Sequence, residues 1–350
     1  MVDSKQAPLD SAAAAKAAFA SVQDKPFPDD IFTAPELRWA VIGCGVIANQ
    51  MAQSLALAGR KLAGVANRTL SKAQAFAEQY GIEKVYESVE DLYADPDIDA
   101  VYITTPHNTH ITYLRDALAA GKHVLCEKAI TLNSAELDEA RAIADEHNVV
   151  LMDATTVLHM PLYQELRRRM DAGEFGRMNL AQLNFGSYKE YGDLTNRFYN
   201  RNLAGGAMLD IGVYALSVMR LFMASQPIEV VSLGNTCETG VDVAGGIVCR
   251  NAEQQLGVVS LTLHSKQPKR SIISFDKCYI EVNEYPRADH ATIVWTADGH
   301  REEVHAGTEA YALCYEMADL EKAVAGDDSK RELLDYASDV MELMTKLRAD

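Results

Sequence analysis

The sequence of 350 residues has few cysteines, no long apolar run and a shortage of positive charge. Its 6 cysteines form no CxxC pair, which argues against a disulfide framework and indicates reduced thiols in a reducing compartment. No apolar run approaches the roughly 20 residues of a membrane-spanning helix. The 33 basic and 50 acidic side chains leave a net charge of -17, which repels phosphate backbones and anionic lipids. We therefore expect a cytoplasmic protein with no nucleic-acid partner and no membrane partner.

The length and composition indicate two domains. A chain of 350 residues exceeds what one hydrophobic core usually organises, and 48% hydrophobic with 24% charged residues is ordinary for a globular protein. We expect an N-terminal arm over residues 1–35, a first domain over residues 36–153 and a second over residues 154–350. Pro26, Pro28 and Pro35 break the second part of the arm, which we expect to be either a frayed tail or a segment that packs on a neighbouring subunit. Its alanine run contains Lys16 and is flanked by acidic residues, unlike an export signal.

In the first domain, short apolar runs alternate with helical patterns. Ser71 and Ser88 each precede a polar partner three residues later, so we expect them to cap the second and third helices. Strands separated by crossover helices form a parallel sheet. We therefore predict an α/β fold with a Rossmann-type, doubly wound parallel sheet. Its expected strands are 37–42, 62–66, 85–86, 101–104, 123–126 and 149–152, and its expected helices are 46–58, 72–80, 89–93, 111–120 and 135–146.

In the second domain, β-type runs follow one another without crossover helices. This order predicts an α+β domain with a large, mostly antiparallel open sheet. We also expect the last helix to return toward the first domain and cover one of the sheets. The expected strands are 179–186, 230–236, 247–250, 256–264, 271–282 and 291–295, and the expected helices are 162–172, 208–223, 309–325 and 331–346.

A glycine-rich turn follows the first strand and opens the first helix. The run GCGVIA from Gly43 to Ala48 matches the dinucleotide fingerprint GxGxxG/A. Its first glycine permits the tight turn, its second lets the backbone approach a pyrophosphate, and the helix N-terminus supplies N–H donors. We therefore expect Gly43, Gly45, Val46 and Ile47 to bind a dinucleotide; an ordinary glycine turn is the alternative.

The end of the second strand bears on the choice between NAD and NADP. An NAD-selective site commonly has an acidic residue about 20 residues beyond the fingerprint, whereas a 2′-phosphate needs a cation. Here the sequence has no acid at that place and supplies Asn67, Arg68 and Lys72. The planar fork of Arg68 is suited to a phosphate. We therefore predict NADP as the cofactor, with NAD as the alternative if Arg68 is only a solvated loop residue.

Polar residues also follow the fourth strand, where ligands of such sheets bind. His107 and His110 lie three apart without a third ligand nearby, so we predict no metal site. The residues of this loop expected to line a nicotinamide pocket are Thr104, Thr105, Pro106, Asn108 and His110.

Three further residues have the chemistry of proton transfer. Lys128, after Glu127 at the end of the fifth strand, is expected to donate a hydrogen bond to a substrate oxygen with a pKa lowered by burial. Asp210 and Tyr214 are four apart and share a face if a helix begins at Met208. The Tyr214 phenol could then protonate a carbonyl. The alternatives are a structural Lys128–Glu127 pair and a buried tyrosine hydrogen-bonded to the carboxylate.

These motifs in this order resemble the glucose-fructose oxidoreductase, inositol dehydrogenase and rhizopine-catabolism (Gfo/Idh/MocA) family. They are GCGVIA, TPHNTH, AGKHVLCEK and GGAMLDIGVY, and the resemblance covers about residues 36–347. It implies that Lys128 lies beside the nicotinamide, and we count Glu127 with Lys128 among the expected cofactor-binding residues. Tyr214 places the chain with the tyrosine-type glucose-fructose oxidoreductases and dihydrodiol dehydrogenases, which mostly use NADP and act on aldoses or cyclic diols. It also implies a homodimer or homotetramer formed through the open sheet.

The chain departs from the family pattern at two positions. Ala129 stands where relatives have the proline of the EKP motif, and His159 where they often have arginine. We list His159 and Arg197 as candidate substrate contacts. The sequence thus predicts an NADP-dependent oxidoreductase of sugar-like substrates in which Lys128 and Tyr214 form the acid/base pair. The alternatives are a sensor or regulatory protein that has lost turnover, and an enzyme that keeps its nucleotide bound throughout catalysis.

Overall fold

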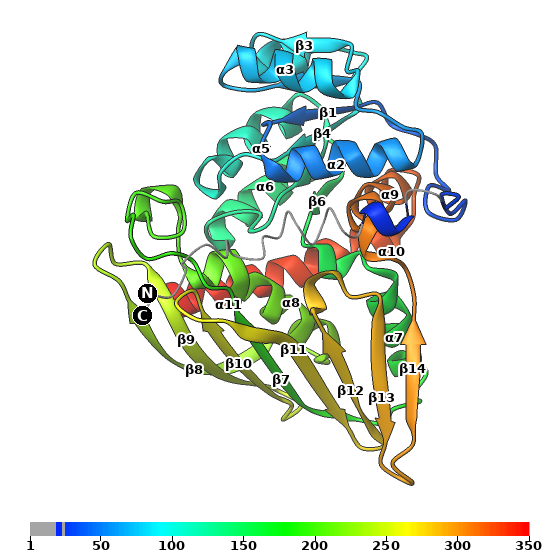
Figure 1. Ribbon diagram of the computed structural model, residues 1–350, viewed down its shortest axis with the longest axis vertical. Coiled ribbons are helices and arrows are strands. Elements are labelled where there is room, and N and C mark those ends of the chain that lie inside the picture. The colour runs from blue at the N-terminus through cyan, green and yellow to red at the C-terminus, as the bar shows by residue number, and fades with distance from the viewer. Residues whose placement is uncertain (1–18, 23–24, 350) are drawn as a thin grey trace, which may run out of the picture.

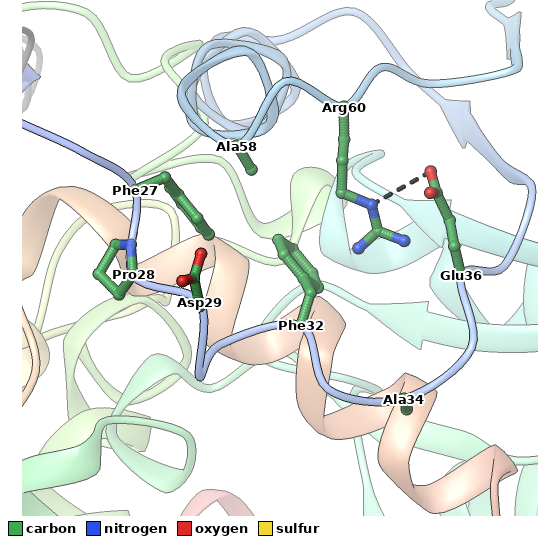
Figure 2. Close-up of a pocket in the computed structure, with 8 residues that line it drawn as sticks. All are labelled: Phe27, Pro28, Asp29, Phe32, Ala34, Glu36, Ala58 and Arg60. Carbon is green, nitrogen blue, oxygen red and sulfur yellow. Dashed lines mark ion pairs between the residues drawn. The ribbon is translucent and has the colours of Figure 1, made fainter.

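The computed structural model describes residues 19–22 and 25–349 as two domains stacked one on the other (Figure 1). Part of the expected arm therefore lies outside the described residues. The part from 25 to 35 packs on its own chain: the Phe27 ring lies 4.9 Å from the Tyr311 ring, and Ile31 is buried. With Arg60, whose guanidinium lies 4.0 Å from the Phe32 ring, this segment lines a pocket of 380 Å³ (Figure 2). The expectation of a frayed tail is wrong for this part of the arm.

The first domain contains the predicted parallel sheet. Its strands are ordered β3-β2-β1-β4-β5-β6, so the order reverses between β1 and β4, as in a doubly wound Rossmann fold. The strands are β1 (Trp39–Ile42), β2 (Gly64–Ala66), β3 (Lys84–Tyr86), β4 (Ala100–Ile103), β5 (His123–Cys126) and β6 (Leu151–Asp153). The helices are α2 (Val46–Leu57), α3 (Leu70–Tyr80), α4 (Val89–Ala94), α5 (His110–Ala119) and α6 (Ser134–Glu146).

One of the two expected helix caps is present. The Ser88 hydroxyl accepts a hydrogen bond from the Asp91 N–H and caps α4. The prediction for Ser71 is wrong, because α3 begins earlier, at Leu70, after the N-cap residue Thr69. Ser71 therefore lies inside the first turn, where its hydroxyl cannot take the N-cap position.

The second domain contains an eight-stranded sheet in the order β14-β13-β12-β11-β7-β10-β9-β8. Only β7 and β10 pair in parallel, so the prediction of a mostly antiparallel sheet is confirmed. The strands are β7 (Met178–Gly186), β8 (Pro227–Thr236), β9 (Asp242–Asn251), β10 (Leu256–Thr262), β11 (Gln267–Phe275), β12 (Cys278–Asn283), β13 (His290–Trp295) and β14 (Arg301–His305).

Two strand predictions in this sheet are wrong. The segment 271–282, expected as a single strand, forms the hairpin β11–β12. The Asp276 carboxylate fixes its turn by accepting hydrogen bonds from the Arg177 N–H and the Asn179 amide. Strand β14 was not predicted, because its sequence REEVH is mostly exposed and lacks an apolar alternation. Both errors concern places where packing with distant residues outweighs the local pattern.

Helices cover one face of the large sheet and join it to the first domain (Figure 1). α11 (Leu333–Ala349) lies against α8 (Val213–Phe222) on one side and α6 and β6 on the other, so it returns to the first domain. The remaining helices are α7 (Pro161–Asp171), α9 (Ala312–Val324) and α10 (Asp328–Arg331). One helical segment among the described residues, Arg201–Phe222, is long and apolar enough to span a bilayer, but 72% of its apolar window is buried inside the protein, as in a core helix.

Candidate functional site

The glycine turn between β1 and α2 has the geometry of a tight strand-to-helix connection. Gly43 has φ +104°, and a Cβ there would lie 2.6 Å from the Thr104 hydroxyl oxygen at the end of β4. A side chain at this position would be strained and would also collide with the neighbouring strand. The turn is fixed by the Gly43 N–H, which donates to the Ala66 carbonyl at the end of β2. Glycine is therefore required at this position.

Gly45, the second glycine of the turn, faces open space. A Cβ at Gly45 would meet no atom within 4 Å, and Gly45 caps α2 without a side-chain hydrogen bond. The first N–H groups of α2 thus lack a capping side chain, and the Val46 side chain beside them is 66% exposed. Free N–H donors, a positive helix end and open space fit the pyrophosphate of a dinucleotide.

The residues expected to distinguish NADP from NAD follow β2, next to this turn. Arg68 is exposed after β2 and makes no ion pair with any of the described residues, while the Asn67 amide donates to the Thr69 carbonyl. Lys72 is close enough to act on Cys44: burial raises the pKa of that thiol to about 11, and the lysine charge opposes the shift. Arg68 and Lys72 therefore place two positive charges near the glycine turn. Asn67, Arg68 and Thr69, which follow β2, include no carboxylate.

The loop after β4 is tied to both domains. The Asn108 amide donates to the Asn202 carbonyl of the second domain at 3.1 Å, while its buried Oδ1 has no partner among the described residues. Pro106 is exposed and Thr105 is half-buried, so both can face a ligand. This unpaired amide oxygen, after β4 at the carboxyl end of the sheet, is the kind of group that a bound nicotinamide amide would satisfy.

The prediction that His110 contacts the cofactor is wrong. The residue is fully buried, and its two ring nitrogens lie 2.8 Å from the Thr105 carbonyl oxygen and 3.0 Å from the Ala129 carbonyl oxygen. His110 therefore joins the loop after β4 to the loop after β5 and positions both. Its type and spacing in the sequence could not distinguish this role from ligand binding.

Lys128, Asp210 and Tyr214 meet across the two domains. Lys128 follows the end of β5. Its Nζ donates to the Asp210 carbonyl at 2.7 Å and lies 3.4 Å from Asp210 Oδ1. The same nitrogen lies 4.8 Å from the centroid of the Tyr214 ring at the start of α8. Asp210 sits in a π-helical turn, Met208–Gly212, that precedes α8. No described residue is hydrogen-bonded to the Tyr214 hydroxyl, so the alternative of a tyrosine bonded to Asp210 is not what the structure contains.

The charges of this cluster differ from the expectation for Lys128. Burial lowers the pKa of Lys128, but the negative charges that Tyr214, Asp210 and Glu127 carry once they lose their protons favour its ammonium more, so the pKa is raised. The prediction of a lowered pKa is therefore wrong, because burial was considered without the surrounding negative charge. Burial raises the pKa of Asp210, but Lys128 and Arg197 outweigh it and hold the value at about 2. The cluster thus contains a lasting ammonium–carboxylate pair beside a phenol.

Tyr214 and His107 complete the cluster as neutral groups. Burial raises the pKa of Tyr214, although the Lys128 charge opposes this. Burial also lowers the pKa of His107 to about 3, and the Lys128 charge adds to the effect. His107 belongs to the loop after the fourth strand whose polar groups were expected to line a nicotinamide pocket, and it was singled out only as a possible metal ligand. Its place directly after β4, at the carboxyl end of the sheet, is the signal that indicates a site residue.

Glu127 supports the loop that carries Lys128. The Tyr102 hydroxyl donates to Glu127 Oε1 at 2.5 Å, and the Lys128 N–H lies 3.2 Å from Oε2. Burial raises the pKa of Glu127, while Tyr102 and Lys128 oppose the shift. Ala129 is fully buried, and the peptide bond joining it to Lys128 is cis.

The two candidate substrate contacts have different positions. His159 is 1% exposed, and its ring nitrogens lie 3.1 Å from Asp319 Oδ2 and 2.8 Å from the Asp153 carbonyl oxygen. The prediction that His159 contacts substrate is wrong, because this ring is enclosed and both nitrogens are in use. Arg197 lies beside the cluster, with Nη2 3.6 Å from Asp210 Oδ1 and a side chain 60% exposed.

Arg287 reaches the site without having been predicted. Both of its terminal nitrogens lie 3.2 Å from Gln50 Oε1 on α2, so it joins the second domain to the helix that follows the glycine turn. Its charge also acts on Glu127 and Tyr214. The sequence around it, EYPRAD, contains no motif, so its place depends on how the domains pack.

A buried carboxyl group behind the site predicts a pH-dependent stability. Glu316 on α9 is fully buried, which raises its pKa to about 8, with neighbouring Glu127 adding to the shift. Between about pH 4.5 and pH 8 the unfolded chain loses this proton while the folded chain keeps it, so stability falls as pH rises. We expect Glu316→Gln to reduce the fall in Tm from pH 5 to pH 8, by roughly 2–4 °C for each kcal/mol removed.

The measurement is thermal unfolding across this pH range, with Glu332→Gln as the control because Glu332 is exposed. The control should reproduce the wild-type dependence. Parallel curves for wild type and Glu316→Gln would contradict the role assigned to Glu316.

Known proteins match both domains. The model of an oxidoreductase family with an NAD-binding Rossmann fold, named GFO_IDH_MocA, matches residues 37–155, and that of the GFO/IDH/MocA C-terminal domain matches residues 163–281. The chain is 32% identical over 254 residues to the trans-1,2-dihydrobenzene-1,2-diol dehydrogenase of Mus musculus, covering 71% of this chain and 75% of that protein. It is 36% identical over 210 residues to the enzyme of the same name from Homo sapiens, covering 59% and 62%.

Solved structures share the fold. A 3-ketoreductase from Actinomadura kijaniata, in complex with TDP-benzene and NADP, has a TM-score of 0.77 and 24% identity, covering 90% of this chain and 98% of that one. A levoglucosan dehydrogenase, in complex with NADH and levoglucosan, has a TM-score of 0.78 and 20% identity, covering 89% and 98%. The two domain matches and the identity to the diol dehydrogenases show that the chain belongs to the Gfo/Idh/MocA family of oxidoreductases.

Proposed function

We propose that the protein is an NADP-dependent oxidoreductase that transfers a hydride between nicotinamide and a CH–OH or C=O carbon of a sugar-like or cyclic diol substrate. The observation that carries this proposal is the meeting of Lys128 and Tyr214, with the ammonium 4.8 Å from the ring centroid and each residue supplied by a different domain. This meeting lies at the carboxyl ends of the parallel strands, where such folds bind their ligands. When bound, the nicotinamide supplies the hydride acceptor or donor.

The chain's own residues handle the proton. In the oxidative direction, the Tyr214 phenolate accepts the proton of the substrate hydroxyl as the hydride leaves the same carbon, and in reduction the phenol returns that proton to the carbonyl oxygen. The Lys128 ammonium stabilises the phenolate and the developing charge on the substrate oxygen. Asp210 holds this ammonium in place through the contacts at 2.7 and 3.4 Å.

The cofactor's binding residues follow from their positions. The α2 N-terminus would hold the pyrophosphate, and Arg68 with Lys72 would hold the 2′-phosphate. Thr104 and Asn108, after β4, and Glu127, after β5, would line the nicotinamide. The remaining proposed contacts are Gly43, Gly45, Val46, Ile47, Asn67, Thr105 and Pro106.

Arg68→Ala should weaken NADP binding by about 10- to 100-fold and leave NAD binding within about twofold. A hydrogen bond to a charged group contributes about 1.5–3 kcal/mol, and only NADP carries the phosphate that would lose it. Calorimetric titration with both nucleotides measures this difference. Arg115→Ala is a matched control, because Arg115 is also partly exposed but pairs with Glu139 on α6. An equal loss for NAD and NADP would rule out the specificity role of Arg68.

The reaction itself is tested by following absorbance at 340 nm with NADP and a panel of aldoses, inositols and cyclic diols. Turnover of a member of the panel supports the proposal. Tight NADP binding without turnover of any member would favour the sensor alternative. One of the two reasons for that alternative was His159, which is buried and lies 3.1 Å from Asp319 Oδ2 in the interior.

We also propose a cytoplasmic homodimer or homotetramer. All six cysteines are free thiols, as suits a reducing compartment. The sheet exposes Val231 by 70%, Leu233 by 83% and Val248 by 47% on β8 and β9, an apolar surface that a second subunit would cover. Light scattering against the chain mass of 38.4 kDa tests the assembly, and a monomer at micromolar concentration would contradict it.

A further inference from the structure

One arginine of the second domain reaches the candidate site without a carboxylate partner. Arg287 is half-buried, and its two terminal nitrogens share a single acceptor, the side-chain oxygen of Gln50 on α2, at 3.2 Å each. No carboxylate of the described residues forms an ion pair with it. A neutral amide does not cancel a positive charge, so this guanidinium keeps its charge in a chain whose net charge is -17.

Buried contacts fix the turn that carries Arg287. This turn is the 3-10 helix η5 (Tyr285–Arg287), which follows β12. The Tyr285 ring is fully buried, and the Tyr285 carbonyl accepts a hydrogen bond from the Tyr163 hydroxyl at 2.7 Å. The backbone is therefore fixed just before Arg287, and the Gln50 side chain binds the other end of the arginine. The guanidinium is thus held at one place between the two domains.

Two ring contacts connect this turn to Tyr214. The Tyr285 ring centroid lies 5.8 Å from the Phe185 centroid, which lies 6.0 Å from the Tyr214 centroid. Arg287, two residues after Tyr285, is therefore placed near the phenol as well as near α2. Its charge also acts on Glu127 after β5 in the first domain. Arg287 thus lies within electrostatic reach of residues from both domains that form the site.

Two cations and two carboxyl groups act on the Tyr214 phenol. Burial raises its pKa, Lys128 and Arg287 oppose that shift, and Glu127 and Asp210 add to it. Lys128 is already shared with Asp210, since its Nζ lies 3.4 Å from Asp210 Oδ1. Arg287 is the other cation, and its partner is an amide. The phenolate that the proposed reaction needs is therefore favoured by a charge that no ion pair among the described residues offsets.

Three carboxyl groups lie within range of the Arg287 charge. Burial raises the pKa of Glu127, Glu309 and Glu316, and the Arg287 charge opposes each shift. Tyr102 on β4 is also in range. The pKa of Glu316 is about 8, so this group is neutral at pH 7. Burial thus favours the neutral forms of the three carboxyl groups, which leave the Arg287 charge available to Tyr214.

We propose that Arg287 is a positioning residue for proton transfer: its charge, held by the Gln50 amide, stabilises the Tyr214 phenolate together with Lys128. This inference rests on the proposed function, in which Tyr214 moves the proton, and adds to it a cation from the turn after β12. Arg287 acts through Tyr214 and needs no contact with the substrate. Because oxidation starts from the phenolate, the loss of this charge should slow oxidation at pH values below the alkaline limb and not above it.

Arg287→Met should lower the rate of oxidation with NADP at pH 8 by about 3- to 30-fold and move the alkaline limb of the pH profile to higher pH. Removing one charge from a partly buried site changes the phenolate fraction by about this factor. Arg287→Lys keeps a positive charge and should restore most of the rate and of the limb position. Steady-state kinetics from pH 6 to pH 10 measures both quantities.

Gln50→Glu tests the charge without removing Arg287. It places a carboxylate where an amide oxygen now lies 3.2 Å from both terminal nitrogens, so the charge is neutralised while the contact is kept. We expect the same direction of change as in Arg287→Met, with slower oxidation at pH 8 and a limb at higher pH. If Arg287→Met does not fold, Gln50→Glu decides the question alone.

Arg167→Met is the matched control. Arg167 is also a partly buried arginine of the second domain, with a side chain 30% exposed, but its Nε pairs with Asp171 on the same helix. Its loss should leave the alkaline limb at the wild-type pH. A limb that moves equally in Arg167→Met and Arg287→Met would show that the shift is not specific to Arg287 and would overturn the inference.

Two further outcomes would overturn it and leave the proposed function standing. One is a limb at the wild-type pH in Arg287→Met or in Gln50→Glu. The other is an equal shift in Arg287→Lys and Arg287→Met, because contacts and not charge would then be the cause. If the wild type oxidises no member of the substrate panel, the proposed function falls. Carbon-13 NMR of labelled tyrosine, with Tyr214 assigned by its absence in Tyr214→Phe, then tests the inference alone: titration of Tyr214 at the same pH in wild type and Arg287→Met would overturn it.

Discussion

Tyr214→Phe is expected to lower kcat by about 10²- to 10⁴-fold while NADP binding stays within about twofold of wild type. The substitution removes only the hydroxyl. The ring keeps its contact with Phe185, whose centroid is 6.0 Å away, and its place 4.8 Å from the Lys128 ammonium. The lost rate is therefore that of proton transfer to the substrate oxygen. Steady-state kinetics with a substrate found at 340 nm, together with nucleotide titration, measures both quantities.

Tyr163→Phe is the matched control for this variant. Tyr163 is also a buried tyrosine of the second domain, but its hydroxyl donates to the Tyr285 carbonyl at 2.7 Å and lies in the core. Its loss should reduce stability by about 0.5–1.5 kcal/mol and leave kcat unchanged. If Tyr214→Phe retained wild-type turnover, or if both variants lost it equally, Tyr214 would have no part in proton transfer.

The pH dependence gives a second readout for Tyr214. Oxidation needs the phenolate, so its rate should rise with pH until Tyr214 has lost its proton, and reduction should show the opposite trend. Burial raises the pKa of Tyr214 above its ordinary value, so the rise belongs to the alkaline range. This alkaline limb should be absent from the residual activity of Tyr214→Phe.

Much of the first domain could be predicted because each element has a local signal. The strand 123–126 was predicted with its observed bounds, since His123 follows a helix-ending glycine and Val124 and Leu125 are fully buried. The turn at Gly43 was also predictable, because a G-x-G run between a strand and a helix has few other uses. Periodicity and turn chemistry suffice where neighbours in sequence are neighbours in space.

The arrangement of the site could be predicted only in part. Two helical residues four apart and a lysine at a strand end indicate candidates, and the family resemblance brings them together. The surroundings that set their charge are not local. Lys128 has a raised pKa because Asp210 and Tyr214 arrive from the other domain, and His159 is enclosed because Asp319, 160 residues later, pairs with it.

The residue that sequence reasoning missed shares this feature. Arg287 meets Gln50 across 237 residues. It belongs to no motif. The first domain thus holds residues with recognisable patterns, whereas the second surrounds them with residues that only the packing of the two domains brings into place.

Lys128→Met should lower kcat by about 10²- to 10³-fold, the usual effect of removing one donor that stabilises developing negative charge. It should also move the alkaline limb of the pH profile to higher pH, because the Lys128 charge lowers the pKa of Tyr214. This shift distinguishes the variant from Tyr214→Phe, in which the limb disappears. Kinetics from pH 6 to pH 10 in the oxidative direction measures both effects.

Lys122→Met separates catalysis from stability. Lys122 is a buried lysine next to the same strand, and its ammonium donates to the carbonyls of Asp95 and Ile98. Its loss leaves two carbonyls without that donor, so Tm should fall while kcat and the pH profile of the folded enzyme stay as in wild type.

The double variant Lys128→Met with Tyr214→Phe tests whether the two groups act together. The fold-reduction in its kcat should be much smaller than the product of the two single reductions, because both groups act on one proton. A multiplicative loss, or an unmoved profile in Lys128→Met, would show that the ammonium and the phenol do not work as a pair.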